Sequence, residues 1–549
     1  MSEIKITLED GSVHKYPKYT TYYEMSKDFT MPGKIIGVIV NNRITSLGNR
    51  AEKDCKVEWL DMNSRLGNRI YASGLRFIFE CAAYKMFPGI KVEYAYSLPR
   101  GVVASLHYEK YLNNEDISLI RKTMSSLVTR DIKIEKLVVK SRDGIDYYEE
   151  RGDEVKAVNI KLITDPTIVL YRLEDVINYY YSEMPYSTGV INKYEVRYLG
   201  KNMIALNFPG QFDEGRIPDY VNYQPIIDSY NFGQDWLSKM KVPYIKDVNR
   251  QIYSGKITNF VRSSELGFNL LIFYTAKKIV ESSNYKYVMI AGPSTSGKTT
   301  ITKRLASYFE LFGLDPIVLS SDNYFRERVD TPKDDKGRYD FECLQAIDLE
   351  YLASDMKKLL KGEEITLPKF NFETGRKEVS SKKVKLKENS IILFEGLHTI
   401  NDDLLPMFPT SQKFKIYVSP FNPLSIDEHN YIPNEDLRLL RRIVRDFRTR
   451  GFSVEKVIES NTKVLEGEAK YINPYIHQAD AFINTSLPYE LGVLKVYVEP
   501  LLFAVPQESK YYNEARRLLS FLKQFFSISS EYVPIDSILR EFIGGEKDD

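Results

Sequence analysis

The stretch YKYVMIAGPSTSGKTT, residues 285–300, decides the fold of its part of the chain. It reads as an apolar strand and a glycine-rich turn that leads into a helix, and a second apolar run, DPIVLSS, follows this helix. Strands and helices that alternate in this way predict an α/β domain with a parallel, doubly wound sheet. Ligands of such sheets bind at the carboxyl ends of the strands. We therefore expect the functional residues at these ends.

The turn between strand and helix fits the pattern G-x-x-x-x-G-K-[ST] in the strand–helix context that this pattern requires. Its glycines let the backbone and the helix N-terminus surround phosphate oxygens with N–H groups. Lys298 is then placed to reach the β- and γ-phosphates, and Thr299 to ligate Mg²⁺. The predicted ATP-binding residues are Gly292, Ser294, Thr295, Ser296, Gly297, Lys298, Thr299 and Thr300.

Two carboxylates follow predicted strands. Asp322 comes after PIVLS and lies beside the strand that precedes the glycine-rich turn (the P-loop) if these two strands pair. There it could accept a proton from an attacking hydroxyl or hold a metal-bound water, and a helix cap is the alternative. Glu395 ends the apolar run NSIILFEG, which has the form of a Walker B strand whose carboxylate orients Mg²⁺. A solvated glutamate at a strand end is the alternative for Glu395.

A predicted helix after NEDLR is rich in arginine. Its arginines are Arg438, Arg441, Arg442, Arg445, Arg448 and Arg450. The first four recur at helical spacing, and apolar residues form a stripe on another face, so a solvated basic face is one interpretation. The other is a movable lid, because phosphoryl transfer spreads negative charge that guanidinium groups stabilise.

From about residue 284 to 487 the chain resembles the uridine kinase and phosphoribulokinase family of P-loop kinases. The motifs that carry the resemblance are, in order, GPSTSGKTT, SSDNYF, RYDF followed by AIDLE, LPKFNFETGRK, ILFEG and LLRRIVRDFRTRG. The resemblance implies ATP and Mg²⁺ as cofactors, Lys298 and Arg445 as catalytic residues, and Asp322 as the general base. It also implies the following site residues: Asp322, Tyr324, Asp340, Phe370 and Arg442 for the acceptor, Arg445 and Arg450 for the phosphates of ATP, and Thr299 and Glu395 for the metal.

The chain departs from the family where the acceptor is recognised. Members that phosphorylate uridine carry a tyrosine and a histidine where Phe370 and Gly375 stand here. A phenylalanine can still stack on a ring, but the missing histidine removes a polar contact to a pyrimidine. The predicted reaction is transfer to the 5′-hydroxyl of a nucleoside, uridine or a relative. A kinase of another small alcohol, such as a sugar phosphate or a pantothenate-like compound, and a nucleotide-bound regulator that binds RNA are the alternatives.

The N-terminal half resembles the editing half of threonyl-tRNA synthetase. Residues 1–60 alternate in short strands around one helix near Tyr22 to Phe29, which is similar to the β-grasp TGS domain of that enzyme. Residues 61–225 open with a helix that ends near Phe87 and continue as an α+β region similar to its second domain. The histidines of the family's H-x-x-x-H pair are replaced by Ser73 and Phe77. The resemblance therefore implies a binding, regulatory or architectural role without editing chemistry or zinc.

The remaining boundaries and the composition complete the expectations. We expect a helical connector over 226–283, the kinase-like domain over 284–490 and a helical extension over 491–549. The 76 Lys and Arg against 75 Asp and Glu give a net charge of +1, which predicts no general attraction to nucleic acid or membranes. Three scattered cysteines and the lack of a secretory pattern predict a cytoplasmic protein. We expect a small-molecule nucleoside as the partner, leave a homo-oligomer open, and regard nucleic acid as a poor candidate.

Overall fold

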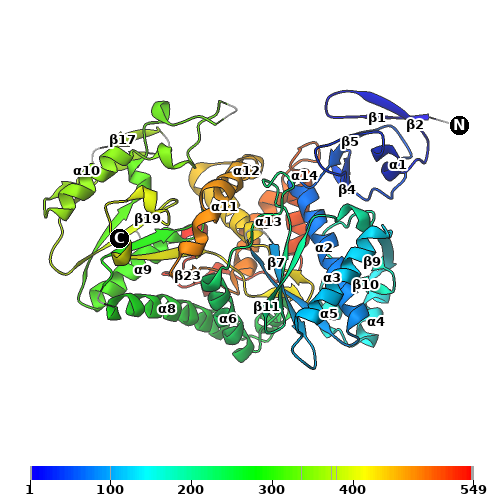
Figure 1. Ribbon diagram of the computed structural model, residues 1–549, viewed down its shortest axis with the longest axis horizontal. Coiled ribbons are helices and arrows are strands. Elements are labelled where there is room, and N and C mark those ends of the chain that lie inside the picture. Colours follow the sequence, from blue (N-terminus) through cyan, green and yellow to red (C-terminus); the bar gives the residue numbers. More distant parts are fainter. Residues whose placement is uncertain are drawn as a thin grey trace.

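The computed structural model describes residues 3–98, 101–282, 284–334, 337–371, 374–378 and 380–545. Figure 1 shows the N-terminal half on one side of the molecule, the parallel sheet of the C-terminal half on the other, and helices α11–α14 between them. Each helix within the described ranges is too short or too polar to cross a bilayer.

The first region is a mixed five-stranded sheet with the order β2-β1-β5-β3-β4. Its elements are β1 (Glu3–Thr7), β2 (Val13–Pro17), α1 (Tyr22–Ser26), β3 (Gly37–Val40), β4 (Arg43–Thr45) and β5 (Cys55–Leu60). Strand β1 alternates buried Ile4 and Ile6 with exposed residues, so one face packs on the buried Met25 of α1. The predicted strands and helix of this region are present.

The second region is built around the buried helix α2 (Arg65–Met86), which the spacing of its apolar residues predicted. The elements that surround α2 are β6 (Lys91–Leu98), β7 (Gly101–His107), α3 (Asn114–Thr129), β8 (Glu135–Lys140), α4 (Ser141–Glu150), α5 (Glu154–Leu162), β9 (Thr167–Leu173), β10 (Val176–Asn178), β11 (Glu195–Gly200) and β12 (Met203–Asn207). They form a four-stranded sheet, β11-β12-β7-β6, and a three-stranded sheet, β10-β9-β8. Helices α6 (Gln224–Lys239), α7 (Ile245–Tyr253) and α8 (Ile257–Glu281) then lead to the C-terminal sheet.

The C-terminal sheet has five strands in the order β14-β19-β13-β20-β23, and every neighbouring pair is parallel. The strands are β13 (Tyr287–Ala291), β14 (Asp315–Ser320), β19 (Ser390–Gly396), β20 (Lys413–Ser419) and β23 (Ala481–Asn484). The predicted parallel sheet is confirmed. The conditional pairing of β14 with the P-loop strand β13 is wrong, because β19 lies between them, with Glu395 opposite both Ser320 and Ile290.

Helices and short hairpins complete this half. The helices are α9 (Lys298–Leu311), α10 (Leu349–Leu360), α11 (Asn434–Arg450), α12 (Val454–Tyr471), α13 (Glu490–Phe503), α14 (Tyr512–Leu522) and α15 (Arg540–Ile543). The hairpins are β16 (Lys369–Asn371) with β17 (Arg376–Glu378), and β21 (Ser425–Asp427) with β22 (Asn430–Tyr431), and β15 (Ile365–Thr366) pairs antiparallel with β18 (Lys383–Val384) on either side of the first hairpin. The arginine-rich helix α11 lies in the middle of the molecule (Figure 1).

The hairpin β21–β22 joins the two halves through buried hydrogen bonds. The carbonyl of His429 accepts a hydrogen bond of 2.8 Å from Arg76, and Lys156 lies 2.6 Å from Nδ1 of the same histidine. Asn159 donates to the carbonyl of Ile426 at 2.8 Å. The hairpin therefore docks on the core of the second region.

A buried ionic cluster around Asp436, in the first turn of α11, makes a second junction. Arg69 of α2 and Arg517 of α14 each bind both carboxylate oxygens at 2.6–3.2 Å. Arg65 approaches Asp436 at 3.9 Å and Glu514 at 3.2 Å. Burial opposes ionisation of Asp436, but the charges of Arg517 and Arg69 outweigh it and hold the pKa of Asp436 well below its usual range.

Candidate active site

The P-loop, residues 292–299, joins β13 to α9. A Cβ on Gly292 would lie 2.2 Å from the carbonyl oxygen of Val418, so the loop passes too close to β20 for any side chain there. Gly297 has φ +85°, which favours glycine. The ammonium of Lys298 donates to the carbonyls of Gly292 at 2.8 Å and Pro293 at 3.2 Å. The predicted phosphate-binding residues thus form one tight turn at the helix N-terminus.

The two residues predicted to hold the metal lie together. The hydroxyl of Thr299 donates to both carboxylate oxygens of Glu395, at 3.2 Å each. Glu395 is buried, and burial raises its pKa while the positive charge of Lys298 opposes that rise. The described residues contain no cluster of three or more His, Cys, Asp or Glu side chains suited to a metal. A hydroxyl and a carboxylate nevertheless fit Mg²⁺, which proteins often hold through one or two side chains together with substrate phosphates.

Asp322 lies in the 3₁₀ turn Ser321–Tyr324 that follows β14. The residue that caps this turn is Ser320, whose hydroxyl accepts from the backbone N–H of Asp322 at 3.4 Å, so the cap interpretation of Asp322 does not hold. Burial raises the pKa of Asp322 above its usual value, and the charge of Lys298 limits the increase. A carboxylate with a raised pKa is a stronger proton acceptor.

Two of the residues predicted to contact the acceptor, Asp340 and Phe370, have defined partners in the structure. The carboxylate of Asp340 accepts from the hydroxyl of Tyr471 at 3.0 Å and from the backbone N–H of Glu342 at 3.0 Å, so its orientation is fixed. The buried ring of Phe370 lies 5.7 Å from that of Phe325, just after the Asp322 turn. Phe370 therefore borders the Asp322 turn, and Asp340 is held by the end of α12.

The structure corrects the expectation for Tyr324. Its side chain is buried in the core beneath the site, and its hydroxyl donates to Asp355 of α10 at 3.3 Å. The ring packs with Leu352 and Met356 of the same helix in one apolar cluster. Tyr324 thus anchors the turn that carries Asp322, because an aromatic residue at this position continues the core, and it presents no surface to an acceptor.

Three of the predicted arginines meet at one buried carboxylate that the sequence reasoning missed. Asp446 lies 2.8 Å from Arg445, 3.3 Å from Arg442 and 3.5 Å from Arg450. Three positive charges around one negative charge leave an excess of two, which would attract phosphate. The sequence held a signal for Asp446, since it is the aspartate within RRIVRD.

The other arginines of α11 have structural partners. Arg438 makes a two-pronged ion pair with Glu468 of α12, and Arg441, fully buried, does the same with Glu490 of α13. Arg441 also donates to the carbonyl of Thr295 in the P-loop at 3.3 Å. The expectation of a movable lid is therefore wrong for the first part of α11, which buried ion pairs fix in place.

Glu342 is a second residue that the sequence reasoning missed. Burial raises its pKa to about 7, the charge of Glu468 adds to the rise, and Arg442 and Lys298 oppose it. Its side chain packs on Gly467 of α12, where a Cβ would lie 2.6 Å from that of Glu342. Glu342 therefore lies within the electrostatic field that the P-loop and the arginines share. Its place two residues after Asp340 was the only sequence signal.

Gly375 adopts φ +69°, so any side chain at this position would strain the backbone. A Cβ there would lie 2.8 Å from both Cβ and Nε of Arg328. Arg328 also donates its backbone N–H to the carbonyl of Gly375 at 2.9 Å. Arg328 thus covers Gly375, the position at which uridine-phosphorylating members of the family carry a histidine. The neighbouring Phe372 and Glu373, within the predicted acceptor segment, lie outside the described residues.

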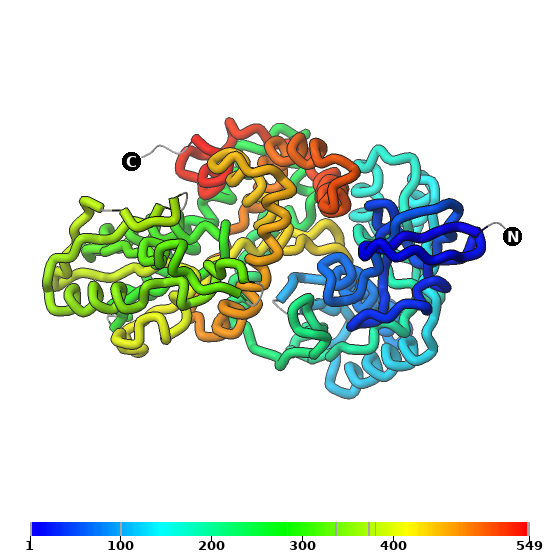
Figure 2. The backbone as a smooth tube through the Cα atoms, turned by 90° about the horizontal axis from the view of Figure 1, so that it is seen from above, coloured from blue at the N-terminus to red at the C-terminus, as the bar shows by residue number. Residues whose placement is uncertain are grey.

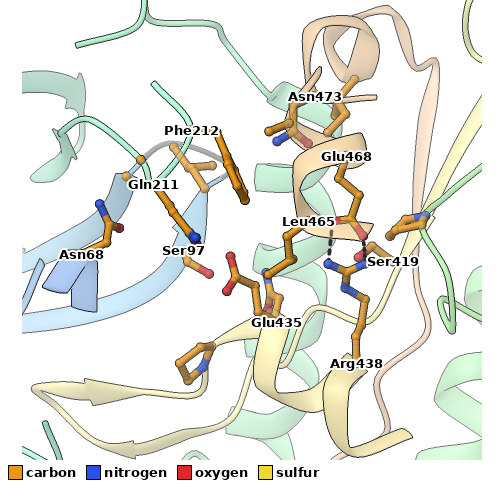
Figure 3. Close-up of a pocket in the computed structure, with 18 of the residues that line it drawn as sticks. Asn68, Ser97, Gln211, Phe212, Ser419, Glu435, Arg438, Leu465, Glu468 and Asn473 are labelled. Carbon is orange, nitrogen blue, oxygen red and sulfur yellow. Dashed lines mark hydrogen bonds and ion pairs between the residues drawn. The ribbon is translucent and has the colours of Figure 1, made fainter. Parts of the chain in front are cut away.

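A separate cavity of about 260 Å³ lies between the two halves of the molecule. Figure 3 shows Asn68 of α2, Gln211 and Phe212 facing Glu435 of α11 and Leu465 of α12 across it. Pro293 is the one P-loop residue in its wall, and neither Asp322 nor Glu395 lines it. The cavity therefore touches the P-loop at Pro293 and is separate from the two carboxylates predicted to act in catalysis and metal binding.

Residues 287–489 match the model of the family described as "Phosphoribulokinase / Uridine kinase family". A uridine kinase from Anoxybacillus flavithermus is 27% identical over 195 residues, which are 35% of this chain and 83% of that protein. A solved structure, "a Possible Uridine Kinase from Bacillus stearothermophilus", is similar at 22% identity, covers 39% of this chain and 97% of that chain, and has a TM-score of 0.26.

The N-terminal half has a relative of another kind. A threonine–tRNA ligase from Acetivibrio thermocellus is 24% identical over 196 residues, which are 35% of this chain and 31% of that protein. The similarity is thus to a part of the ligase. Together with the P-loop, the Thr299–Glu395 pair and the arginines around Asp446, the comparisons identify the protein as a phosphotransferase of the kinase type, whose residues 287–489 match the model of the phosphoribulokinase/uridine kinase family.

Proposed function

We propose that the protein transfers the γ-phosphoryl group of ATP to the 5′-hydroxyl of a nucleoside, uridine or a close relative. The observation that carries this proposal is the arrangement of the sheet edge. There Glu395 lies between the P-loop strand and the strand that leads to Asp322, and its carboxylate bonds to Thr299 of the P-loop. A phosphate cradle, a candidate metal site and a candidate base are thus adjacent.

The donor side follows from the P-loop geometry. The loop N–H groups and Lys298 would hold the triphosphate, with Lys298 exchanging its two carbonyl partners for phosphate oxygens. Thr299 and Glu395 would hold Mg²⁺, which when bound supplies positive charge to the β- and γ-phosphates. Arg442, Arg445 and Arg450 would add their excess charge where negative charge spreads in the transition state.

On the acceptor side, Asp322 would take the proton. As the hydroxyl oxygen forms its bond to the γ-phosphorus, the bond from that phosphorus to the bridging oxygen of ADP breaks, and the hydroxyl proton passes to the Asp322 carboxylate. The raised pKa of Asp322 suits it to this role. Asp340 would accept hydrogen bonds from other hydroxyls of the acceptor, Arg442 would help to position it, and Phe370 would face its ring.

One observation favours a second class of acceptor. Arg328 covers Gly375 at the place of the histidine that the family uses on uridine. A guanidinium there suits an acceptor with a negative charge, such as a sugar phosphate. A kinase of this kind would use the same donor residues and the same base, so only the acceptor distinguishes the two candidates.

The experiment is a coupled assay of ADP release with purified protein across nucleosides, sugar phosphates and pantothenate-like alcohols, with product masses measured. We expect a phosphorylated nucleoside. If only a sugar phosphate or another alcohol is phosphorylated, the second class replaces the first. If no alcohol on the panel is phosphorylated, the kinase proposal is wrong.

Asp322→Asn tests the base directly. We expect kcat to fall at least about 100-fold with ATP affinity nearly unchanged, because a general base contributes on the order of 10²–10⁴ to the rate. Asp315→Asn is the matched control: it lies at the other end of β14, where its carboxylate accepts an exposed hydrogen bond from Lys387 and a part-buried one from Ser390. Turnover by Asp322→Asn equal to that of the control would remove Asp322 as the base.

For the N-terminal half we propose a binding or architectural role without hydrolytic chemistry. Ser73 shares a short hydrogen bond with Ser182 and accepts another from Arg76 at 3.0 Å, and Phe77 is buried, so neither position offers a metal ligand. Salt-sensitive binding of tRNA by the full chain would favour a role in RNA recognition. A lack of binding at low salt would leave the architectural role, and in either case we expect a cytoplasmic protein.

A further inference from the structure

The segment from Asp536 to Gly545, which we call the C-terminal strap, packs on the P-loop and on the N-terminal end of α9. Ile538, Leu539 and Phe542 are fully buried. A Cβ on Gly297 would lie 2.4 Å from Cδ1 of Ile538, which shows that the strap touches the P-loop backbone. The strap belongs to the red end of the chain in Figure 2 and lies outside the family match at 287–489.

The carboxylate of Glu541 lies where a phosphate of the nucleotide is expected. It accepts a hydrogen bond of 2.9 Å from the hydroxyl of Thr300, one of the predicted ATP-binding residues. Thr300 is in the first turn of α9, whose N–H groups lack partners within the helix and attract anions. The protein thus supplies an anion of its own to the phosphate-binding end of the helix.

The strap is held by two arginines of helix α11. Arg448 of α11 donates to the carbonyls of Phe542 at 3.2 Å and Glu541 at 3.3 Å. The ring of Phe542 lies 4.8 Å from the guanidinium of Arg441, which in turn binds the P-loop carbonyl of Thr295. A displacement of Glu541 would therefore disturb the contacts of the strap with α11 and, through Arg441, the contact of α11 with the P-loop.

We propose that Glu541 is an internal competitor of ATP: its carboxylate occupies Thr300 in the nucleotide-free protein, and the phosphates of ATP must displace it. The proposal rests on the proposed function, because it requires that the P-loop bind a nucleoside triphosphate. Two anions at one helix N-terminus repel each other, so phosphate and Glu541 cannot share Thr300 at full strength. The strap thereby lowers the apparent affinity for ATP until it moves away.

Direct titration of ATP with Mg²⁺ into the full chain, without an acceptor, tests the proposal by calorimetry. Glu541→Gln keeps a hydrogen-bonding group but removes the charge, and we expect its Kd for ATP to be about three- to tenfold lower than that of the wild type. Glu531→Gln, an exposed glutamate of the same chain end, is the matched control and should bind as the wild type does. An unchanged or higher Kd for Glu541→Gln overturns the proposal.

Hydrogen exchange of residues 536–545 provides a second readout that does not depend on the variant. Saturating ATP with Mg²⁺ should speed exchange in the strap, since its anchor at Thr300 is released. Slower exchange would mean that Glu541 helps to bind ATP, which contradicts the proposal. If neither the wild type nor Glu541→Gln binds ATP, both the proposed function and this inference fail. If both bind ATP with the same Kd, only the inference fails.

Discussion

The arginines in the two halves of helix α11 differ in how many carboxylates they have as partners. In its first half, each arginine has a carboxylate of its own: Arg438 pairs with Glu468 and Arg441 with Glu490. In its second half, Arg442, Arg445 and Arg450 share the single carboxylate of Asp446. The first half is therefore balanced in charge, and the second carries an unbalanced positive charge.

The difference suggests a way to distinguish structural arginines from the arginines that we propose bind phosphate. A buried guanidinium with a full carboxylate partner has no charge to offer a ligand, and its loss leaves a buried carboxylate unpaired. A guanidinium that shares its carboxylate keeps attraction for an additional anion. Substitutions in the first half should thus reduce stability, and substitutions in the second half should reduce turnover.

The largest expected effect is that of Arg441→Ala on stability. We expect the free energy of unfolding to fall by about 3–5 kcal/mol, because Glu490 would be left charged and fully buried. Urea unfolding measures the loss. In the double variant Arg441→Met with Glu490→Leu, most of the stability should return, because an apolar pair leaves no buried charge. A double variant as unstable as the single one would contradict the role of the ion pair.

Arg445→Ala should act on catalysis instead. We expect kcat to fall about 100- to 1,000-fold, or about 3–4 kcal/mol in transition-state energy, with the melting temperature nearly unchanged. Steady-state kinetics and a thermal melt on the same preparation separate the two effects. A large loss of stability with little loss of kcat would reverse the comparison between the two halves of the helix.

Glu342→Gln should change how stability depends on pH. The folded pKa of about 7 lies above the ordinary value of 4.5, so the folded protein binds more protons than the unfolded chain between these values. Glu342 therefore costs the wild type stability as pH rises from about 4.5 to 7, by at most about 3 kcal/mol. Urea unfolding at pH 5 and pH 8 measures this decline.

Burial also raises the pKa of Glu80 and of Glu428 to about 7, so these two residues make the free energy of unfolding depend on pH in both proteins. The contribution of Glu342 is therefore the difference between the pH dependence of the wild type and that of the variant. Parallel pH dependences of wild type and Glu342→Gln would show that Glu342 does not titrate in this range.

Arg450→Ala should have the smallest effect. Its side chain is 45% exposed and lies 3.5 Å from Asp446, so solvent and salt screen its charge. We expect KM for ATP to rise about three- to tenfold, and the rise to shrink as ionic strength increases. Kinetics at two salt concentrations check it. An effect as large as that of Arg445→Ala, with no salt dependence, would place Arg450 in direct contact with the transferring group.

The sequence predicted those parts of the site that depend on neighbours along the chain. The P-loop lies within one turn, and its glycine requirement shows in φ +85° at Gly297. The alternation of strand and helix predicted the parallel sheet. The strand order depended on long-range pairing, so the position of β19 between β13 and β14 was not predicted.

What escaped prediction depends on contacts between distant residues. The first four arginines of α11 recur at helical spacing, yet their partners are spread from Asp446 to Glu490. Only these partners separate the structural arginines from those that we propose bind phosphate. Glu342 is marked by a pKa that burial raises, a tertiary effect that its position two residues after Asp340 does not show. Tyr324 carries the right residue type, but its ring points into the core.

The ionic cluster at Asp436 bears on how the protein is made. Arg69 is synthesised hundreds of residues before Asp436, and Arg517 emerges from the ribosome only well after it. The helix that carries the arginines predicted to bind phosphate therefore gains its contacts with Arg517 only after the family-like domain has been translated. A nascent chain halted at the end of that domain would hold the P-loop and the Arg438–Glu468 pair but would lack the contacts of Arg517 to Asp436, so this ionic junction is completed only in the last stage of synthesis.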